Sequence, residues 1–430
     1  MKKSLLALAV AALAVSSAAS AATIYDKDGV SVDVYGRVQA VYYSQDSGNN
    51  AQSAANDGNL NASSRLGFNF RSELSSWATA FANVEWQNAD DDANDDFNSR
   101  YLWVGVDFGQ FGAIKFGKFE DAVKYVIATT DIFDDWGCNG QLGNDDRRDG
   151  MFAYSWSGYG VDVNVTFGTA KDDQHVDGAF YSTYEGLWTG DTGANGLIDP
   201  DTASLITNNT SDGNEVGGRE KLDIEYSYAV SVGYTSPAVL FGPISVKAGF
   251  GGAQFQDQDA AEGDIFGYQG NIYDSYTQWA VSASWGTLGD GLFLGLMAQA
   301  RDFDLYDSIP AILDGSWGNL RVSDYLGDYT VSGVEAVVSY GFANGVSLTT
   351  GWEWMNIDMD GAGKPDVDAY TIPVYVNYQV NPNFRVWAEA RFDAGTDDSN
   401  SNPLDNFDEV SEGAYGLTEN VYSIGARYTF

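Results

Sequence analysis

The final residues of the chain alternate between two kinds of side chain. Residues of one parity are mostly aromatic or aliphatic: Tyr422, Ile424, Ala426, Tyr428 and Phe430. Residues of the other parity are mostly small or polar: Val421, Ser423, Gly425, Arg427 and Thr429. Because successive side chains of a β-strand point to opposite faces, this pattern predicts a strand. An apolar, aromatic-flanked face is typical of a strand with lipid on one side and water on the other.

The same alternation recurs along the chain and predicts about sixteen strands. One clear example has apolar residues at Leu222, Ile224, Tyr226, Tyr228, Val230, Val232 and Tyr234. Another has them at Phe384, Val386, Ala388, Ala390 and Phe392. Alternation also fits a soluble sandwich whose apolar faces pack together, so it does not decide between sandwich and membrane barrel.

The connections between the strands favour the barrel. Short turns are predicted at 74–76, 110–112, 158–160, 289–291, 343–345 and 381–383. Long polar segments are predicted at 46–60, 89–97, 119–149, 171–220, 258–272, 305–327, 359–366 and 397–418. Alternating short and long connections are typical of a closed antiparallel transmembrane β-barrel with periplasmic turns and extracellular loops. We therefore expect one all-β domain over residues 22–430, with an aromatic girdle at the strand ends.

Residues 1–21 have the three regions of a secretory signal peptide. Lys2 and Lys3 precede an apolar run over residues 5–15, and small residues follow as far as Ala21. This run is shorter than the ~20 residues that a membrane-spanning helix needs. We expect cleavage before Ala22. No later window is apolar enough for a spanning helix, so insertion would require a closed barrel in the outer membrane.

The chain is strongly acidic, with 22 Lys and Arg against 61 Asp and Glu and a formal charge of −39. Without Lys2 and Lys3 the charge of the mature chain is −41. Nucleic acid is excluded as a partner because phosphate binding needs the opposite charge. In a channel, such acidity predicts a preference for cations. The single cysteine, Cys138, excludes an intrachain disulfide.

Residues for enzymatic chemistry are scarce. His175 is the one histidine, so acid–base catalysis of the Ser–His–Asp kind is not expected. The acidic run 90–96 lacks the spacing and glycine of a calcium loop, although divalent cations could bind loosely to such acidic loops. The glycines at 249–252 are not followed by a helix and do not predict a phosphate site. We expect no cofactor, no metal site and no enzyme.

Several arginines are predicted to line the lumen. Alternation places Arg37 and Arg65 on the inner faces of two neighbouring strands. Both faces near Arg100 are apolar, so periodicity does not place it. Arg147 and Arg148 precede a strand and are expected near its mouth. The alternative is that Arg65 and Arg100 merely pair with local carboxylates.

Acids that could oppose these arginines come from the segment 119–149. They are Glu120, Asp121, Asp131, Asp134 and Asp135. If this loop folds inward, it narrows the lumen and places acids across from arginines. The alternative, a solvated cap outside the barrel, is about equally compatible with the sequence. Because screening acts over ~8 Å at physiological salt, such charges would filter solutes only where the passage is narrow.

Local motifs resemble a known family. They include Val-Asp-Val-Tyr-Gly-Arg ending at Arg37, Ser-Ser-Arg-Leu-Gly-Phe around Arg65, Phe-Gly-Lys-Phe at 116–119, and the closing Tyr-Thr-Phe. These are similar to the trimeric general-diffusion porins of Gram-negative outer membranes. The resemblance implies a sixteen-stranded barrel, a homotrimer, and a third loop that constricts the pore. It also implies that Arg37, Arg65 and Arg100 occupy the basic wall, with Arg147 or Arg148 as a further member.

The chain departs from that family at the third loop. The family's Pro-Glu-Phe-Gly-Gly-Asp signature is absent, and Asp-Ile-Phe-Asp-Asp-Trp-Gly at 131–137 stands in its place. Which acids form the constriction therefore does not follow from the resemblance. Small residues at Ala78, Ala80 and Ala82 favour close approach of a neighbouring wall, so trimer contact is predicted there.

The function predicted from the sequence is a water-filled, cation-preferring channel for passive diffusion of small hydrophilic solutes and ions. Its expected surroundings are membrane lipid and lipopolysaccharide. Two alternatives from other classes stay open. A substrate-specific channel would carry a track of stacked aromatic residues along the lumen, and a surface adhesin or receptor would depend on its loops and conduct little.

Overall fold

A computed structural model of the chain describes residues 21–44, 58–89, 97–143, 146–178, 219–256, 273–305, 328–359, 366–395 and 420–430. Nearly all of these residues lie in strands. No helix among them is long and apolar enough to cross a membrane. The signal-peptide prediction for residues 1–21 falls, apart from Ala21, outside the described residues, as do most of the predicted long loops.

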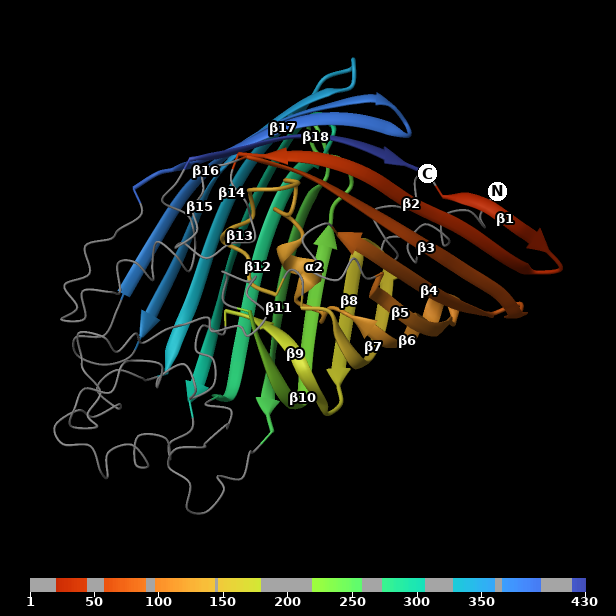
Figure 1. Cartoon of the computed structure of the whole chain (residues 1–430). Helices are drawn as coiled ribbons and strands as arrows, with labels where there is room; N and C mark the ends of the chain where they lie inside the picture. The colour runs from red at the N-terminus through yellow and green to blue at the C-terminus, as the bar shows by residue number, and fades with distance from the viewer. Residues whose placement is uncertain are drawn as a thin grey trace, which may run out of the picture.

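Sixteen strands form one closed antiparallel ring (Figure 1). Seven come from the first part of the chain: β2 (Val30–Tyr43), β3 (Asn59–Ser75), β4 (Ala78–Ala89), β5 (Asn98–Asp107), β6 (Ala113–Phe119), β7 (Arg148–Gly158) and β8 (Val161–Gly168). The other nine are β10 (Arg219–Thr235), β11 (Ile244–Phe255), β12 (Tyr273–Thr287), β13 (Asp290–Leu305), β14 (Tyr329–Gly341), β15 (Val346–Met359), β16 (Asp366–Asn381), β17 (Phe384–Asp393) and β18 (Val421–Thr429). The predicted barrel is confirmed.

The ring closes between the last strand and the first. In β18, Ile424 and Tyr428 pair with Tyr42 and Val38 of β2. Gly36 and Phe430 exchange backbone hydrogen bonds of 2.8 and 3.0 Å. Closure removes the unpaired strand edges that a membrane interior does not tolerate.

Two further strands pair with strands of the ring without increasing the number of strands around it. The sequence analysis does not predict β1 (Ala22–Lys27), which pairs with β2. The second, β9 (Lys171–Asp177), follows β8 and pairs with the start of β10. The predicted loop 171–220 is therefore wrong at both ends, because Lys171–Asp177 and the residues from Arg219 onward form paired strands.

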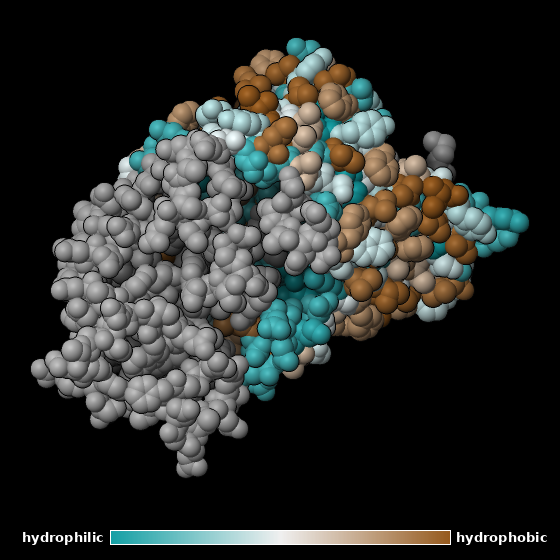
Figure 2. All heavy atoms as spheres, in the orientation of Figure 1, coloured by the Kyte–Doolittle hydropathy of each residue, from teal (hydrophilic) through white to brown (hydrophobic). Residues whose placement is uncertain are grey.

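Exposure follows the predicted alternation along most strands. In β10, Tyr228, Val230 and Val232 are 41–48% exposed, whereas Ala229 and Ser231 are 3% and 1% exposed. The apolar side chains lie on the outer surface, and brown patches cover much of the described wall in Figure 2. An apolar exterior with a polar interior is the arrangement that lipid outside and water inside require.

The start of β10 departs from this phase. Leu222 and Ile224 are buried at 4% and 2%, although the alternation placed them on the same face as the exposed Tyr226. The register shifts between Ile224 and Tyr226 against β11, so one extra residue enters the strand. Such a bulge exchanges the two faces, and the prediction that Leu222 and Ile224 face outward is wrong for that reason.

Candidate functional site

The described part of the connection between β6 and β7, residues 120–143 and 146–147, lies inside the barrel. Figure 1 shows its short helix, α2 (Lys124–Ile127), surrounded by strands. Val126 and Ile127 are buried against Ala229, Ala280 and Met297 of the wall. These apolar residues hold α2 on β10, β12 and β13, which explains why a four-residue helix is stable here. The predicted inward fold of the third loop is confirmed.

Beyond α2, the loop is held by three glutamates of the wall. Consecutive backbone N–H groups donate to them, from Asp134 to Gly140. Glu389 of β17 accepts four, from Asp134, Asp135, Trp136 and Gly137, at 2.6 to 3.0 Å. Glu353 of β15 accepts those of Cys138 and Asn139, and Glu335 of β14 accepts that of Gly140. Hydrogen bonds to charged acceptors are about twice as strong as neutral ones.

Two of these glutamates are direct neighbours. Glu335 and Glu353 face each other across the β14–β15 register, and both are almost fully buried. Like charges directly opposite destabilise a sheet unless other groups compensate. Side chains of the loop do so, since Gln141 donates to Glu335 at 2.8 Å and Asn139 donates to Glu353 at 2.8 Å. The wall therefore needs the loop in place to satisfy its own buried acids.

The loop acids Asp134 and Asp135 also bind the wall. Asp134 pairs with Arg385 at 2.7 Å and Arg427 at 2.9 Å. Burial alone would raise the pKa of Asp134, but the two guanidinium groups outweigh it and hold the pKa below its usual value. Asp135 accepts hydrogen bonds from Trp387 and Ser423 and has no cation this close, so burial raises its pKa.

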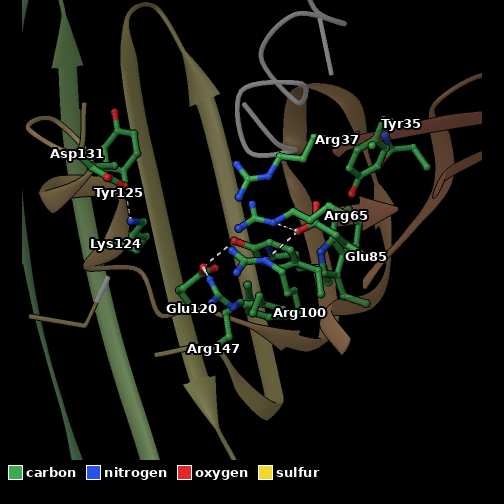
Figure 3. A pocket seen from close by; sticks show the side chains of 18 of the residues that line it. Tyr35, Arg37, Arg65, Glu85, Arg100, Glu120, Lys124, Tyr125, Asp131 and Arg147 are labelled. Carbon is green, nitrogen blue, oxygen red and sulfur yellow. Dashed lines mark hydrogen bonds and ion pairs between the residues drawn. The ribbon is translucent and has the colours of Figure 1, made fainter. Parts of the chain in front are cut away.

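Beside the loop lies a cavity of about 1230 Å³ whose opposite wall is basic. Figure 3 shows Arg37, Arg65 and Arg100 on this wall, with Lys124 and Asp131 on the other side. Glu85 of β4 bridges two of the arginines, at 3.0 Å to Arg100 and 4.0 Å to Arg65. Arg147 pairs with Glu120 at 3.2 Å, which also accepts a hydrogen bond from Tyr101. The arrangement is a cavity bounded by arginines on one side and by the loop on the other.

Comparison with known proteins agrees with this geometry. A family model described as Gram-negative porin matches residues 7–398. The chain belongs to the Gram-negative porin family.

Particular members show the extent of the similarity. The outer membrane porin PhoE of Escherichia coli K12 is 31% identical over 161 residues, which span 36% of this chain and 44% of PhoE. The solved structure of Salmonella typhi OmpF in complex with daunomycin covers 95% of this chain and all of that one, at 16% identity and a TM-score of 0.59. A trimer form of Vibrio cholerae OmpT covers 94% of this chain and all of that one, at 16% identity and a TM-score of 0.56. This porin is a multi-strand β-barrel of the outer membrane.

The predicted basic residues occupy different places in the porin. Arg37, Arg65, Arg100 and Arg147 line the cavity. Arg148 does not; it is buried in the wall, where it donates to Tyr276 at 2.6 Å and pairs with Asp146 at 3.3 Å. Both neighbours Arg100 and Tyr101 reach the lumen because the β4–β5 register skips Arg100, which lies in a bulge. Alternation did not place Arg100 because both faces there are apolar, and the structure adds that a bulge interrupts the alternation at this residue.

The predicted acids are all paired or hydrogen-bonded. Asp131 pairs with Lys124 at 2.8 Å, within the loop itself. Asp121 accepts hydrogen bonds from Gln278 at 2.7 Å and from the backbone N–H of Val123 at 2.8 Å. Asp134 and Asp135 are held at the wall as described above. Of the predicted acids, Asp131 has the most exposed ion-paired carboxylate, at 32% of its side chain.

Sequence reasoning missed the wall partners of the loop. The wall partners all lie on inner faces of strands, and parity alone placed three of them there: Glu389, Arg385 and Arg427. The other two are Glu335 and Glu353. A run of acids at inner positions of β14, β15 and β17 was the available signal. The role of the three glutamates as acceptors was not visible, because their donors are backbone N–H groups more than 190 residues away in sequence.

The other singled-out residues form no reactive group. His175 lies on β9, and its side chain is outside the described residues. Cys138 is a free cysteine; burial and the nearby Glu335 raise the pKa of its thiol. Within the part of the chain that the structure describes, no three His, Cys, Asp or Glu side chains are grouped to hold a metal ion.

Proposed function

We propose that this porin is a water-filled channel through which small hydrophilic solutes and ions diffuse passively. The observation that carries the proposal is the cavity between the arginine wall and the inward loop. Ten basic side chains and seven carboxylates of the described residues contribute to its lining, which suits hydrated solutes. The loop is fixed by hydrogen bonds along its length, so the passage has a set width. No stacked aromatic track is predicted on the inner faces, which favours general diffusion over a substrate-specific channel.

Assembly as a homotrimer is part of this proposal. It is supported by the trimer form of OmpT and by the small residues Ala78, Ala80 and Ala82 on β4. Membrane lipid and lipopolysaccharide are the proposed surroundings, because the exposed side chains of the strands are apolar. Loose binding of divalent cations is proposed for acidic loops such as 90–96, which lie outside the described residues.

A preference for cations follows from the formal charge of −39 and stays a prediction. It requires that acids dominate the field where the passage is narrow. The acids of the third loop are instead engaged with Lys124, Arg147, Arg385, Arg427 and neutral donors. A cation preference would therefore have to arise from acids other than those five.

The proposal is tested by reconstituting the purified porin into planar bilayers and liposomes. We expect discrete conductance steps and swelling of liposomes in uncharged sugars, with a rate that falls as sugar size rises. A protein that inserts but neither conducts nor passes sugars would contradict the proposal. Saturable block by one solute at low concentration would favour a substrate-specific channel instead.

A further inference from the structure

We infer that the narrow passage of this porin favours anions over cations, although the chain as a whole is strongly acidic. The inference rests on the proposed channel function and concerns the sign of the charges at its narrowest part. In the described part of the chain, ten basic side chains and seven carboxylates line the cavity. The chain has 61 acidic residues, and among those that the structure describes these seven line the cavity.

Most of the lining carboxylates are already neutralised by a lining cation. Glu85 pairs with Arg65 and Arg100, and Glu120 pairs with Arg147. In the loop, Asp131 pairs with Lys124. Asp134 pairs with two arginines of the wall. A solute in the passage therefore meets these acids as ion pairs with little net field.

Four lining cations have no carboxylate partner among the described residues: Arg37, Arg71, Lys115 and Lys247. Lys247 donates to the backbone oxygen of Tyr125, and Lys115 lies 4.1 Å from the ring centre of Phe119. Three lining acids have no cation partner within the described ranges: Asp33, Asp121 and Asp135. Asp121 and Asp135 accept hydrogen bonds from neutral groups. The remaining charge is net positive.

Arg37 is the centre of this excess. It faces Arg65 directly across the β2–β3 register, an arrangement of like charges that destabilises a sheet unless an anion compensates. Glu85 binds Arg65 but no described carboxylate binds Arg37, and its buried Nε atom has no hydrogen-bond partner among the described residues. In Figure 3 its guanidinium group points into the cavity. A passing anion such as chloride, a carboxylate or a phosphate would supply the missing charge.

Distance determines whether the basic lining or the acidic remainder of the chain sets the ion preference. A charge within the passage acts at a few Å, whereas exposed charges more than ~8 Å away are screened at physiological salt. Local sign therefore outweighs total charge. The result is the opposite of the preference predicted from −39.

The test is the reversal potential of the trimer in a planar bilayer under a tenfold gradient of potassium chloride. We expect the wild-type porin to pass chloride in preference to potassium. Arg37→Gln should shift the permeability ratio roughly twofold toward potassium, the combined effect on the two ions of one unit charge at ~8 Å in water that is screened by physiological salt. Lys27→Gln is the matched control; it removes the same charge from β1, where the side chain is 70% exposed, and should leave the ratio unchanged.

Arg37→Lys keeps the charge and should keep the chloride preference, which separates loss of charge from a folding defect. A wild-type preference for potassium would overturn the inference and leave the channel proposal standing. Equal shifts in Arg37→Gln and Lys27→Gln would also overturn it, because total rather than local charge would then set the preference. Absence of current would instead contradict the channel proposal itself.

Discussion

The carboxylate of Glu389 on β17 accepts the backbone N–H of Trp136 in the third loop at 2.6 Å. The two residues are 253 positions apart in sequence. The contact is one of a series in which wall carboxylates bind consecutive N–H groups of the loop, so the strands near the C-terminus fix a segment from the N-terminal half. The position of the loop beside the cavity therefore depends on buried acids that do not line the cavity.

Replacing the carboxylate of Glu389 should loosen the loop. In Glu389→Gln, an NH₂ group replaces one acceptor oxygen and faces loop N–H groups. We expect the free energy of unfolding to fall by about 2 kcal/mol, within the range for hydrogen bonds to charged groups. Guanidinium unfolding followed by tryptophan fluorescence measures this, and single-channel recordings should show greater current noise. Glu225→Gln, at an exposed position of β10, is the control. An equal loss of stability in both variants would show that the hydrogen bonds from Glu389 to the loop do not account for the effect.

The bridging acid Glu85 should restrain the charge of the basic wall. It is 2% exposed and pairs with Arg65 and Arg100, so Glu85→Gln leaves both arginines without their carboxylate. We expect the chloride-to-potassium permeability ratio to rise roughly twofold, as for one unit charge at ~8 Å that is screened by physiological salt. Reversal potentials give the ratio, with Glu73→Gln at an exposed position near the end of β3 as control. A ratio that stays constant or falls would refute this role of Glu85.

Arg301 on β13 should be important for stability rather than for conduction. It is 1% exposed and bonds Asp146 at 3.0 Å and Gln278 at 2.7 Å. Removing one member of a buried ion pair leaves the other uncompensated, so Arg301→Met should cost about 3 kcal/mol of unfolding free energy.

A double-mutant cycle tests whether that loss comes from the pair. If it does, Arg301→Met combined with Asp146→Asn should cost less than the sum of the single variants. Denaturant midpoints of the four proteins give the coupling. Additive losses would show that Arg301 stabilises the barrel through other contacts.

Asp134 should make the docked loop sensitive to acid. Its pKa in the folded protein lies below the usual value near 3.9, because Arg427 and Arg385 favour the carboxylate despite burial. A depressed pKa contributes stability that is present above the unfolded pKa and is lost as pH falls through the folded one. The wild type should therefore exceed Asp134→Asn in stability at pH 5 to 7, and the gap should close below about pH 4. Thermal unfolding across this pH range measures the difference, with Asp28→Asn at the exposed β1–β2 turn as control. A stability difference between wild type and Asp134→Asn that stays constant with pH would contradict the lowered pKa of Asp134.

Much of the fold was predictable because alternation is a local property. The alternating sequence around Tyr228 and Val230 predicts that both face outward. The inner position of Arg37 and Arg65 follows from the apolar residues on either side of each. Prediction failed at bulges, because one inserted residue exchanges the inner and outer faces of a strand. A bulge places Leu222 on the inner face, and another interrupts the alternation at Arg100. The wall residues that bind the loop could not be predicted either, because residue type does not show that Glu353 or Glu389 accepts hydrogen bonds from backbone N–H groups. Ion pairing within the lumen likewise depends on distances that sequence does not contain.

The inward position of the third loop can be measured through its accessibility from the passage. Asp131→Cys in a Cys138→Ser background places a single thiol on the loop, at a side chain that is 32% exposed. A bulky methanethiosulfonate reagent added during a planar-bilayer recording should reduce the current per channel by more than half. The same reagent on Lys27→Cys in that background should leave the current unchanged. Full modification of the thiol at position 131, shown by mass, with no loss of current would place the loop outside the conducting path and contradict the structure's central feature.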